Sequence, residues 1–376
     1  MSETRPDIAI HLHCFFNGGI EQVTINLIRS FIERGLKVDL VLNFPGLLFL
    51  WKTPPELRVI DLKAQPIYKR LPNLVRYLRQ EQPKALLSGS HYANEVALLA
   101  KRISGVSTKV VVTEHTTLSR EAKNTSRLRF RHWAPLAARL VYPSADSIIT
   151  VSQGVTEDLV NITGLPKSRF QMIYNPVVTP EQLKKAKDPV EHPWFAPGEL
   201  PVVIGAGRLE KQKNFPNLIT AFAKVRQVRP ARLVIFGEGS LRSQLQELIH
   251  ELGLDNDVEM PGFVKNIEAY LSKSAVFVLS SDWEGLPTIL IEALAVGTPV
   301  VSTDCPSGPS EILDNGKYGE LVRVNDSEAL ADKILNVLSG KSKPVDSAWL
   351  SQFTLENVCS KYLDILNLTE DLKTKN

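Results

Sequence analysis

The chain has 376 residues, which is more than one typical domain holds and suits two. Its 43% hydrophobic and 23% charged residues are ordinary for a globular protein, and its three scattered cysteines exclude a disulfide framework or a zinc site. The net charge of +3 conceals a basic stretch over residues 1–180 and an acidic one over 181–376, which indicates either an anionic partner for the first half or ordinary solvated faces.

The first half alternates short β-branched runs with amphipathic segments. The segments that follow helical periodicity include Glu21–Arg34 and Ala93–Ser104. This alternation is typical of βαβ units, in which helices cover a parallel sheet. The runs predicted as strands are Ile8–His13, Lys37–Leu42, Ala85–Ser88, Lys109–Thr113, Ser147–Val151 and Phe170–Ile173.

No secretory or membrane-spanning segment is predicted in the chain. The first residues are polar, which gives no sign of a secretory signal, and a cytoplasmic protein is expected. The longest apolar run, Leu40–Trp51, has 12 residues and includes Asn43 and Pro45, whereas a spanning helix needs about 20.

A proline-rich stretch over residues 176–201 is predicted to be an irregular linker. The alternation then restarts, and a helix-like segment, Trp349–Leu366, ends it. Two Rossmann-like halves are therefore expected, with ligands beyond the carboxyl ends of their strands. The second half is predicted to hold strands Val202–Gly205, Arg232–Phe236, Val258–Met260, Val276–Ser280 and Pro299–Ser302, and helices Phe215–Val228, Ser240–Leu252, Ile267–Ser272 and Thr288–Ala295.

Two positions of the first half lie where such sheets bind ligands. Gly18 and Gly19 follow the first predicted strand and open a helix, so their amides suit a phosphate. The alternative is a glycine turn needed only for steric reasons, and the dinucleotide fingerprint G-x-G-x-x-G is absent. His115 follows the fourth predicted strand, where a histidine serves either structure or catalysis.

Cations cluster after the first strand of the second half. Arg208 lies directly at the predicted strand exit, and Lys211 and Lys213 follow closely. A guanidinium offers a planar fork and an ammonium a point charge, so together they suit a diphosphate. The alternative is a solvated basic loop.

Two glutamates eight residues apart, Glu284 and Glu292, give the most informative pattern. Glu292 is expected about two turns into a helix that begins near Pro287. The free amides at the start of that helix would hold phosphate oxygens, and the two carboxylates would accept hydrogen bonds from sugar and ribose hydroxyls. A capping acid plus a surface acid explains either glutamate alone. The segment with these amides is Gly285-Leu286-Pro287-Thr288, in which Pro287 has no N–H to donate.

Over nearly its whole length the chain resembles the retaining GT-B glycosyltransferases of family 4. Glu284-x7-Glu292 resembles the family's E-x7-E element, and Gly207-Arg208-Leu209 with Lys213-Asn214 resembles its diphosphate clamp. Gly18-Gly19-x-Glu21 resembles its first glycine loop, and His115 its donor-side histidine. Further likeness lies in the hinge segment Tyr174–Val177, in the nucleotide-side loops Phe236–Gly239 and Gly262–Val264, and in Cys305–Glu311, a loop of members that build bacterial polysaccharides, lipopolysaccharide cores or lipid-linked oligosaccharides.

The resemblance implies the GT-B fold, an α/β architecture of two Rossmann-like domains facing across a cleft. An N-terminal acceptor domain is expected over residues 1–178 and a C-terminal donor domain over 179–349. A last helix over 350–376 is expected to pack back on the first domain.

The resemblance also implies roles for these residues. Arg208 and Lys213 would neutralise the donor diphosphate, Glu292 would bind the ribose, and Glu284 the transferred sugar. His115 would contact that sugar near the reacting carbon, and it is counted as catalytic together with Arg208, Lys213 and Glu284. Donor binding would further involve Gly18, Gly19, Gly237, Val264, Gly285, Leu286, Pro287 and Thr288.

The predicted activity is therefore that of a hexosyl-type transferase (EC 2.4). It would move a hexose or N-acetylhexosamine, with retention, from a nucleotide sugar to a glycan or glycolipid acceptor in polysaccharide synthesis. UDP is the expected nucleotide, GDP remains open, and the nucleotide sugar is a co-substrate, so no cofactor, bound metal or nucleic-acid partner is expected. Asp255-Asn256-Asp257 resembles the metal motif of another glycosyltransferase fold but is predicted to be a polar turn.

Alternatives remain at this stage. A nucleotide-sugar epimerase with a GT-B-like fold is the main one, and a non-catalytic subunit is another. Peripheral contact with the inner face of an anionic membrane is also open, because two segments suit it: the apolar Leu47–Trp51 and a basic segment after His115. The basic segment holds Arg120, Lys123, Arg127, Arg129, Arg131, His132 and Arg139, with Trp133 and Leu136 between them; both segments suit ordinary packing as well.

Overall fold

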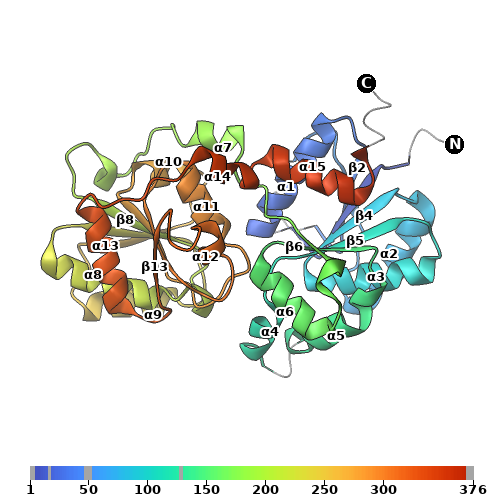
Figure 1. Ribbon diagram of the computed structural model, residues 1–376, viewed down its shortest axis with the longest axis horizontal. Helices are drawn as coiled ribbons and strands as arrows, with labels where there is room; N and C mark the ends of the chain where they lie inside the picture. Colours follow the sequence, from blue (N-terminus) through green and yellow to red (C-terminus); the bar gives the residue numbers. More distant parts are fainter. Residues whose placement is uncertain (1–4, 16–17, 46–52, 127–129, 370–376) are drawn as a thin grey trace. The chain divides into compact units, whose positions relative to one another are not determined.

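The computed structural model describes residues 5–15, 18–45, 53–126 and 130–369 (Figure 1). The chain divides into two compact units, one made of Met1–Val177 with Gln352–Asn376 and one of Val178–Ser351. Within the described residues, each unit is built on one parallel sheet with helices packed on it. The α/β architecture expected from the sequence is confirmed.

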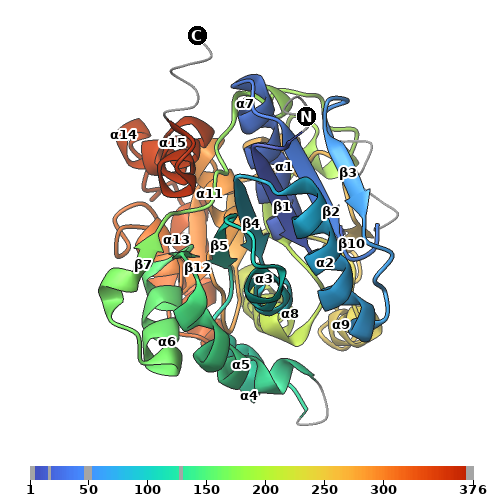
Figure 2. The ribbon, with the colours of Figure 1, turned by 90° about the vertical axis from the view of Figure 1, so that its right-hand side faces the viewer.

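The first unit holds a sheet with the strand order β3-β2-β1-β4-β5-β6-β7, counting the described strands. Figure 2 shows β3, β2, β1, β4 and β5 side by side, with α2 and α3 lying across one face. The strands are β1 (Ile8–Leu12), β2 (Val38–Leu42), β3 (Arg58–Asp61), β4 (Ala85–Gly89), β5 (Lys109–Glu114), β6 (Ser147–Thr150) and β7 (Phe170–Met172). The helices are α1 (Gly19–Glu33), α2 (Ile67–Glu81), α3 (His91–Ser104), α4 (Leu118–Lys123), α5 (Ala134–Val141), α6 (Gln153–Thr163) and α15 (Leu355–Leu366).

The second unit holds a sheet with the order β10-β9-β8-β11-β12-β13. Its helices α8 and α13 lie side by side (Figure 1). The strands are β8 (Val202–Ala206), β9 (Arg232–Phe236), β10 (Val258–Gly262), β11 (Val276–Leu279), β12 (Val300–Thr303) and β13 (Glu320–Val322). The helices are α7 (Pro180–Lys185), α8 (Phe215–Val228), α9 (Arg242–Glu251), α10 (Ile267–Lys273), α11 (Thr288–Ala295), α12 (Pro309–Ile312), α13 (Ser327–Leu338) and α14 (Ser347–Leu350).

In both sheets the strand order reverses direction at one place. In the first unit the reversal lies between β1 and β4, and in the second between β8 and β11. Loops leave the two strands at such a point in opposite directions and open a crevice beyond their carboxyl ends. The topology therefore marks one candidate ligand position in each unit.

The last helix, α15, belongs to the first unit and packs against α1. Its apolar side chains Val358, Tyr362 and Leu363 are buried in the same core as β1 and β2. The single helix predicted over Trp349–Leu366 is wrong in detail, because a 3-10 turn at Ser351–Phe353 separates α14 from α15. The buried Phe353 anchors this turn in the first unit.

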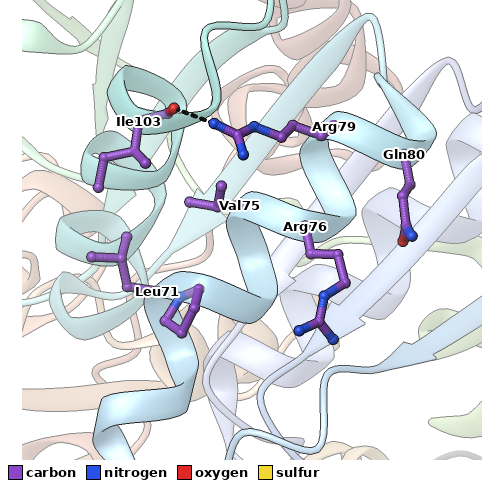
Figure 3. A pocket seen from close by; sticks show the side chains of 7 residues that line it. Leu71, Val75, Arg76, Arg79, Gln80 and Ile103 are labelled. Atoms are coloured by element: carbon purple, nitrogen blue, oxygen red, sulfur yellow. Dashed lines mark hydrogen bonds between the residues drawn. The ribbon is translucent and has the colours of Figure 1, made fainter.

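A groove of about 470 Å³ lies on the surface between α2 and α3 (Figure 3). Arg79 on α2 bridges the two helices by donating to the carbonyl of Ile103 at 3.0 Å. Leu71 and Val75 line the groove beside it. In the described part of the chain, no helix combines the length and the apolar character that crossing a membrane demands.

Candidate functional site

An ion pair lies at the crevice of the second unit. Lys213 ends the 3-10 turn Lys211–Lys213 after β8, and Glu284 follows β11. The Nζ of Lys213 lies 2.6 Å from Oε1 of Glu284, and the two side chains are only 15% and 7% exposed. Ser281 Oγ donates to the same carboxylate oxygen at 2.6 Å. The structure thus brings together two of the predicted site residues that lie far apart in the sequence.

The backbone around Lys213 is tied to the exit of β11. Ser280 Oγ donates to the carbonyl of Lys213 at 2.8 Å, and Asn214 Nδ2 donates to Asp282 Oδ1 at 2.6 Å. The lysine side chain runs across Gly207, where an added Cβ would lie 3.1 Å from Lys213 Cε. A larger residue at 207 would therefore push the ammonium away from Glu284.

Gln212 is a site residue that the sequence reasoning missed. Its Oε1 accepts a hydrogen bond from Arg208 at 3.1 Å, and its Nε2 donates to the carbonyl of Trp283 at 2.9 Å. It thereby connects the exposed guanidinium of Arg208 to the segment that carries Glu284. Its side chain is a neutral amide, so it does not stand out among candidate charged groups, although it lies between Lys211 and Lys213 in the sequence.

Helix α11 begins at Thr288, and no side chain caps its first amides. The predicted helix start near Pro287 is confirmed, but Glu292 lies about one turn into the helix and not two, because one turn takes about 3.6 residues. Burial raises the pKa of Glu292 to about 8, and the nearby carboxylate of Glu268 adds to the rise, while a hydrogen bond with Thr288 opposes it.

The turn before α11 rests on the Cys305–Glu311 loop. Ser307 Oγ donates to the carbonyl of Gly285 at 2.7 Å. Gly308 has a φ of +95°, and an added Cβ would lie 2.5 Å from Pro287 Cδ. The loop therefore fixes the shape of the segment Gly285-Leu286-Pro287-Thr288, which was predicted to face phosphate oxygens.

Gly237 holds the exits of β8, β9 and β10 close together. Its φ is +132°, and an added Cβ would lie 1.9 Å from the carbonyl oxygen of Gly207. Its amide donates to the carbonyl of Gly262 at 2.8 Å, and Val264 lies half-buried two residues further on. The structure thus shows a packing role for Gly237, and nucleotide contact by Gly237 and Val264 stays a prediction.

His115 lies in the first unit, directly after β5. Its Nε2 faces Gly89, where an added Cβ would lie 3.9 Å away. Burial lowers the pKa of His115 to about 4, and Asn175 partly opposes this shift. The preceding residue, Glu114, is buried, accepts a hydrogen bond from Tyr142 OH at 2.8 Å and another from the His115 amide at 3.2 Å. A neutral imidazole is thus held at the carboxyl edge of the sheet.

The glycine loop opens α1 as predicted, but a carboxylate lies over it. Gly18 is the N-cap of α1, which begins at Gly19, and an added Cβ on Gly18 would lie 2.6 Å from Glu21 Oε2. A phosphate bound beside these glycines would be repelled by the negative charge of the Glu21 carboxylate. A phosphate at Gly18 and Gly19 would therefore require the Glu21 side chain to turn away.

The Asp255-Asn256-Asp257 segment forms a turn, as predicted. Asp257 forms ion pairs with Arg226 at 2.8 Å and with Arg232 at 2.7 Å. Its carboxylate thus serves the folding of the second unit.

The predicted site residues therefore fall into two groups. In the second unit, Lys213 and Glu284 are in contact, Arg208 joins them through Gln212, and Glu292 lies on the helix that follows. His115 and the loop of Gly18 and Gly19 belong to the first unit. Arginine, lysine and uncapped helix amides in one place suit a diphosphate.

Two family models match the chain. Residues 17–180 match Glycosyltransferase Family 4, and residues 188–348 match Glycosyl transferases group 1. A Campylobacter jejuni protein named N-acetylgalactosamine-N,N'-diacetylbacillosaminyl-diphospho-undecaprenol 4-alpha-N-acetylgalactosaminyltransferase is 32% identical over 346 residues, which is 88% of this chain and 90% of that protein. The lipopolysaccharide core biosynthesis glycosyltransferase LpsE of Rhizobium meliloti is 26% identical over 368 residues, which is 95% of this chain and 98% of that one.

Solved structures share the fold. Anabaena HepE in complex with UDP and glucose superposes with a TM-score of 0.75 at 21% identity, covering 96% of this chain and 100% of that chain. Sucrose-phosphate synthase from Thermosynechococcus elongatus gives a TM-score of 0.81 at 19% identity, covering 99% and 100%. The predicted two-domain fold is thereby confirmed.

Proposed function

Because the chain belongs to the GT-B glycosyltransferases of the family 4 type, we propose that it transfers a hexose or N-acetylhexosamine from a UDP-sugar to a lipid-linked or core glycan. The main structural support for donor binding is the Lys213–Glu284 ion pair at the β8–β11 crevice, to which Arg208 is linked through Gln212. Positive charges fixed in advance stabilise the diphosphate as the sugar departs, which is the main electrostatic task in such a transfer.

The relatives support the proposed substrates. The name of the C. jejuni protein describes transfer onto a sugar attached to diphospho-undecaprenol, and the R. meliloti name describes lipopolysaccharide core synthesis. The HepE structure was solved with UDP and glucose. We therefore propose UDP as the donor nucleotide and a lipid-bound glycan as the acceptor.

We also propose retention of the anomeric configuration. The Glu284 carboxylate accepts hydrogen bonds from Lys213 and Ser281, so it already serves to orient these two side chains. The departing phosphate can itself accept the proton of the acceptor hydroxyl, and the reaction then needs neither a carboxylate base, a bound metal nor a cofactor. The anomeric proton coupling of the product, measured by NMR, should match that of the donor, and turnover should persist in EDTA.

A screen of nucleotide sugars with lipid-linked acceptors tests the proposed function. UDP release that depends on the acceptor, together with a longer glycan by mass spectrometry, is the expected result. An epimerised nucleotide sugar formed without any acceptor would instead identify an epimerase and refute the transferase assignment.

The exposed face of α5 is proposed to contact an anionic membrane. Trp133, just before α5, and Leu136 and Leu140 on it are exposed large apolar residues, and Arg139 lies beside them. Apolar side chains can enter the lipid interface while cations face lipid phosphates. Among the other candidate residues, Arg120 and Lys123 are exposed on α4, whereas Leu47–Trp51, Arg127 and Arg129 lie outside the described residues. Flotation with anionic vesicles should carry the protein upward, and the variant Trp133→Ala with Leu140→Ala should stay below; flotation of both proteins alike would refute this face.

A further inference from the structure

The crevice of the first unit holds a polar cluster with no part in the function proposed so far. It lies around the carboxyl end of β1, one of the two strands between which the strand order reverses. His11 lies within β1 and His13 follows that strand, while Arg70 comes from the first turn of α2 and Tyr92 from the first turn of α3. Asn43, at the end of β2, completes the cluster. This is the position at which a parallel sheet of this kind binds ligands.

A hydrogen-bonded chain fixes the two histidines. Asn43 Oδ1 accepts from His11 Nε2 at 3.4 Å, and Asn43 Nδ2 donates to His13 Nδ1 at 3.1 Å. With Nδ1 of His13 acting as an acceptor, the proton of its neutral ring is on Nε2. The ring also stands edge-on to Phe44 at a centroid distance of 5.2 Å. His13 therefore presents a preorganised N–H donor.

Arg70 is the cation of this cluster, and its guanidinium makes few hydrogen bonds within the protein. Its Nε is buried without a hydrogen-bond partner in the described part of the chain, and one of its Nη atoms donates to the carbonyl of Gln65 at a long 3.5 Å. The guanidinium lies close enough to lower the pKa of both His11 and His13, although burial is the main cause of their values of about 4. At neutral pH the cluster is thus one permanent positive charge beside neutral imidazoles.

We propose that Arg70 and His13 bind the phosphate or diphosphate through which the acceptor glycan is attached to its carrier. A guanidinium fork and a ring N–H are donors that match phosphate oxygens, and no carboxylate in the described residues pairs with Arg70. The excess of basic residues over the first half of the sequence favours the same class of ligand. This assignment rests on the proposed transferase function and adds a recognised group on the acceptor.

Binding of inorganic pyrophosphate tests the site directly. The protein is first saturated with UDP, so that the donor-side cations are occupied, and pyrophosphate is then titrated by calorimetry. Arg70→Gln should weaken pyrophosphate binding at least tenfold, and Arg70→Lys should restore it partly, because the charge returns without the fork. Arg76→Gln is the matched control, since Arg76 is exposed on the same helix (Figure 3). Equal affinity in wild type and Arg70→Gln would overturn the proposal.

An NMR titration of His13 adds a readout that a purely structural role would not change. A bound anion favours the imidazolium, so pyrophosphate should raise the pKa of His13 above its value of about 4. In Arg70→Gln the shift should be much smaller. An unchanged His13 signal at saturating pyrophosphate would contradict the site.

Kinetics with paired acceptors identify the source of the phosphate. One acceptor carries its sugar on a lipid diphosphate, and the other carries the same sugar as an alkyl glycoside. Arg70→Gln should raise KM at least tenfold for the first acceptor only, with the KM for the UDP-sugar unchanged. Equal effects on both acceptors, or none, would overturn the assignment to the acceptor. UDP binding is measured separately for the unmodified protein and each variant. If the transferase function itself were wrong, the unmodified protein would show no transfer to either acceptor.

Discussion

At the scale of single residues, Lys213 and Glu284 form an ion pair whose two side chains are largely buried. The pair fixes the position of the Lys213 ammonium beside Glu284. Ser281 donates to the same carboxylate oxygen of Glu284 as Lys213 does, and Gln212 donates to the other oxygen at 3.5 Å. The proposed donor site is thus held together by hydrogen bonds between the segment at residue 212 and the segment at residue 284.

Replacing Lys213 by alanine should lower kcat by about 100- to 1000-fold, the usual effect of removing one fixed electrostatic donor. Glu284 would also lose its partner, so a modest loss of thermal stability is expected. Lys273→Ala is the control, because Lys273 is an exposed lysine at the end of α10. Steady-state kinetics check the result, and near-normal turnover in Lys213→Ala would remove this residue from the site.

Glu292 should make UDP binding depend on pH. Its pKa of about 8 means that the ligand-free protein carries it mostly protonated at pH 7. Ribose hydroxyls donate to the ionised form, so the affinity for UDP should rise as the pH increases through about 8. Calorimetry at a series of pH values measures this. Glu292→Gln should show only the pH dependence of the nucleotide itself, and identical profiles for both proteins would contradict the role.

At the scale of elements, the predicted strands, and the predicted helices other than Trp349–Leu366, agree with the structure to within two residues, whereas β13 and α13 were not predicted. The edge strand β3 was missed because its side chains are mostly exposed or half-buried, so apolar alternation is weak. Helix α2 was missed because it is rich in arginine and contains Pro72. Helix α7 lies inside the predicted linker: Pro180 occupies its first position, where proline starts a helix, and Thr179 caps it.

The candidate site was predictable only in part for a related reason. Arg208, Lys213 and Glu284 could be predicted because they are charged and follow predicted strands, and ligands bind beyond the carboxyl ends of such strands. The contact between Lys213 and Glu284 depends on loop geometry that spacing does not encode. The cluster around Arg70 was invisible, because neither α2 nor its packing beside His13 was foreseen.

Helix α15 should be essential for the stability of the first unit. Leu363 is 3% exposed and packs in the core shared with β1 and β2. Leu363→Ala should lower the free energy of unfolding by about 2–5 kcal/mol, since it leaves a cavity. Lys361→Ala, exposed on the same helix, should change it by less than about 0.5 kcal/mol. Denaturant unfolding checks both, and equal effects would show that α15 contributes little.

At the scale of the whole molecule, two units with separate cores repeat one design, a parallel sheet with a reversal point at its carboxyl edge. Different side chains lie near the two points: cations with a glutamate in the second unit, and an arginine with histidines in the first. In the proposed function, the second unit would bind the activated donor and the first unit the acceptor.

UDP should therefore protect the two units unequally. Hydrogen exchange should slow at residues 207–213 and 285–290, which surround the proposed diphosphate position, because bound phosphate stabilises those loops and amides. The strands β1 and β4 should change little. Mass spectrometry of proteolytic peptides reports each segment. Protection confined to the first unit would contradict the assignment of the donor site.

The most direct measurement is a crystal structure of the protein with UDP. The account predicts that the diphosphate lies within hydrogen-bonding distance of Lys213 and Arg208, facing the first amides of α11, with the ribose at Glu292. A diphosphate bound at a different place on the chain, with the β8–β11 crevice empty at saturating UDP, would contradict it.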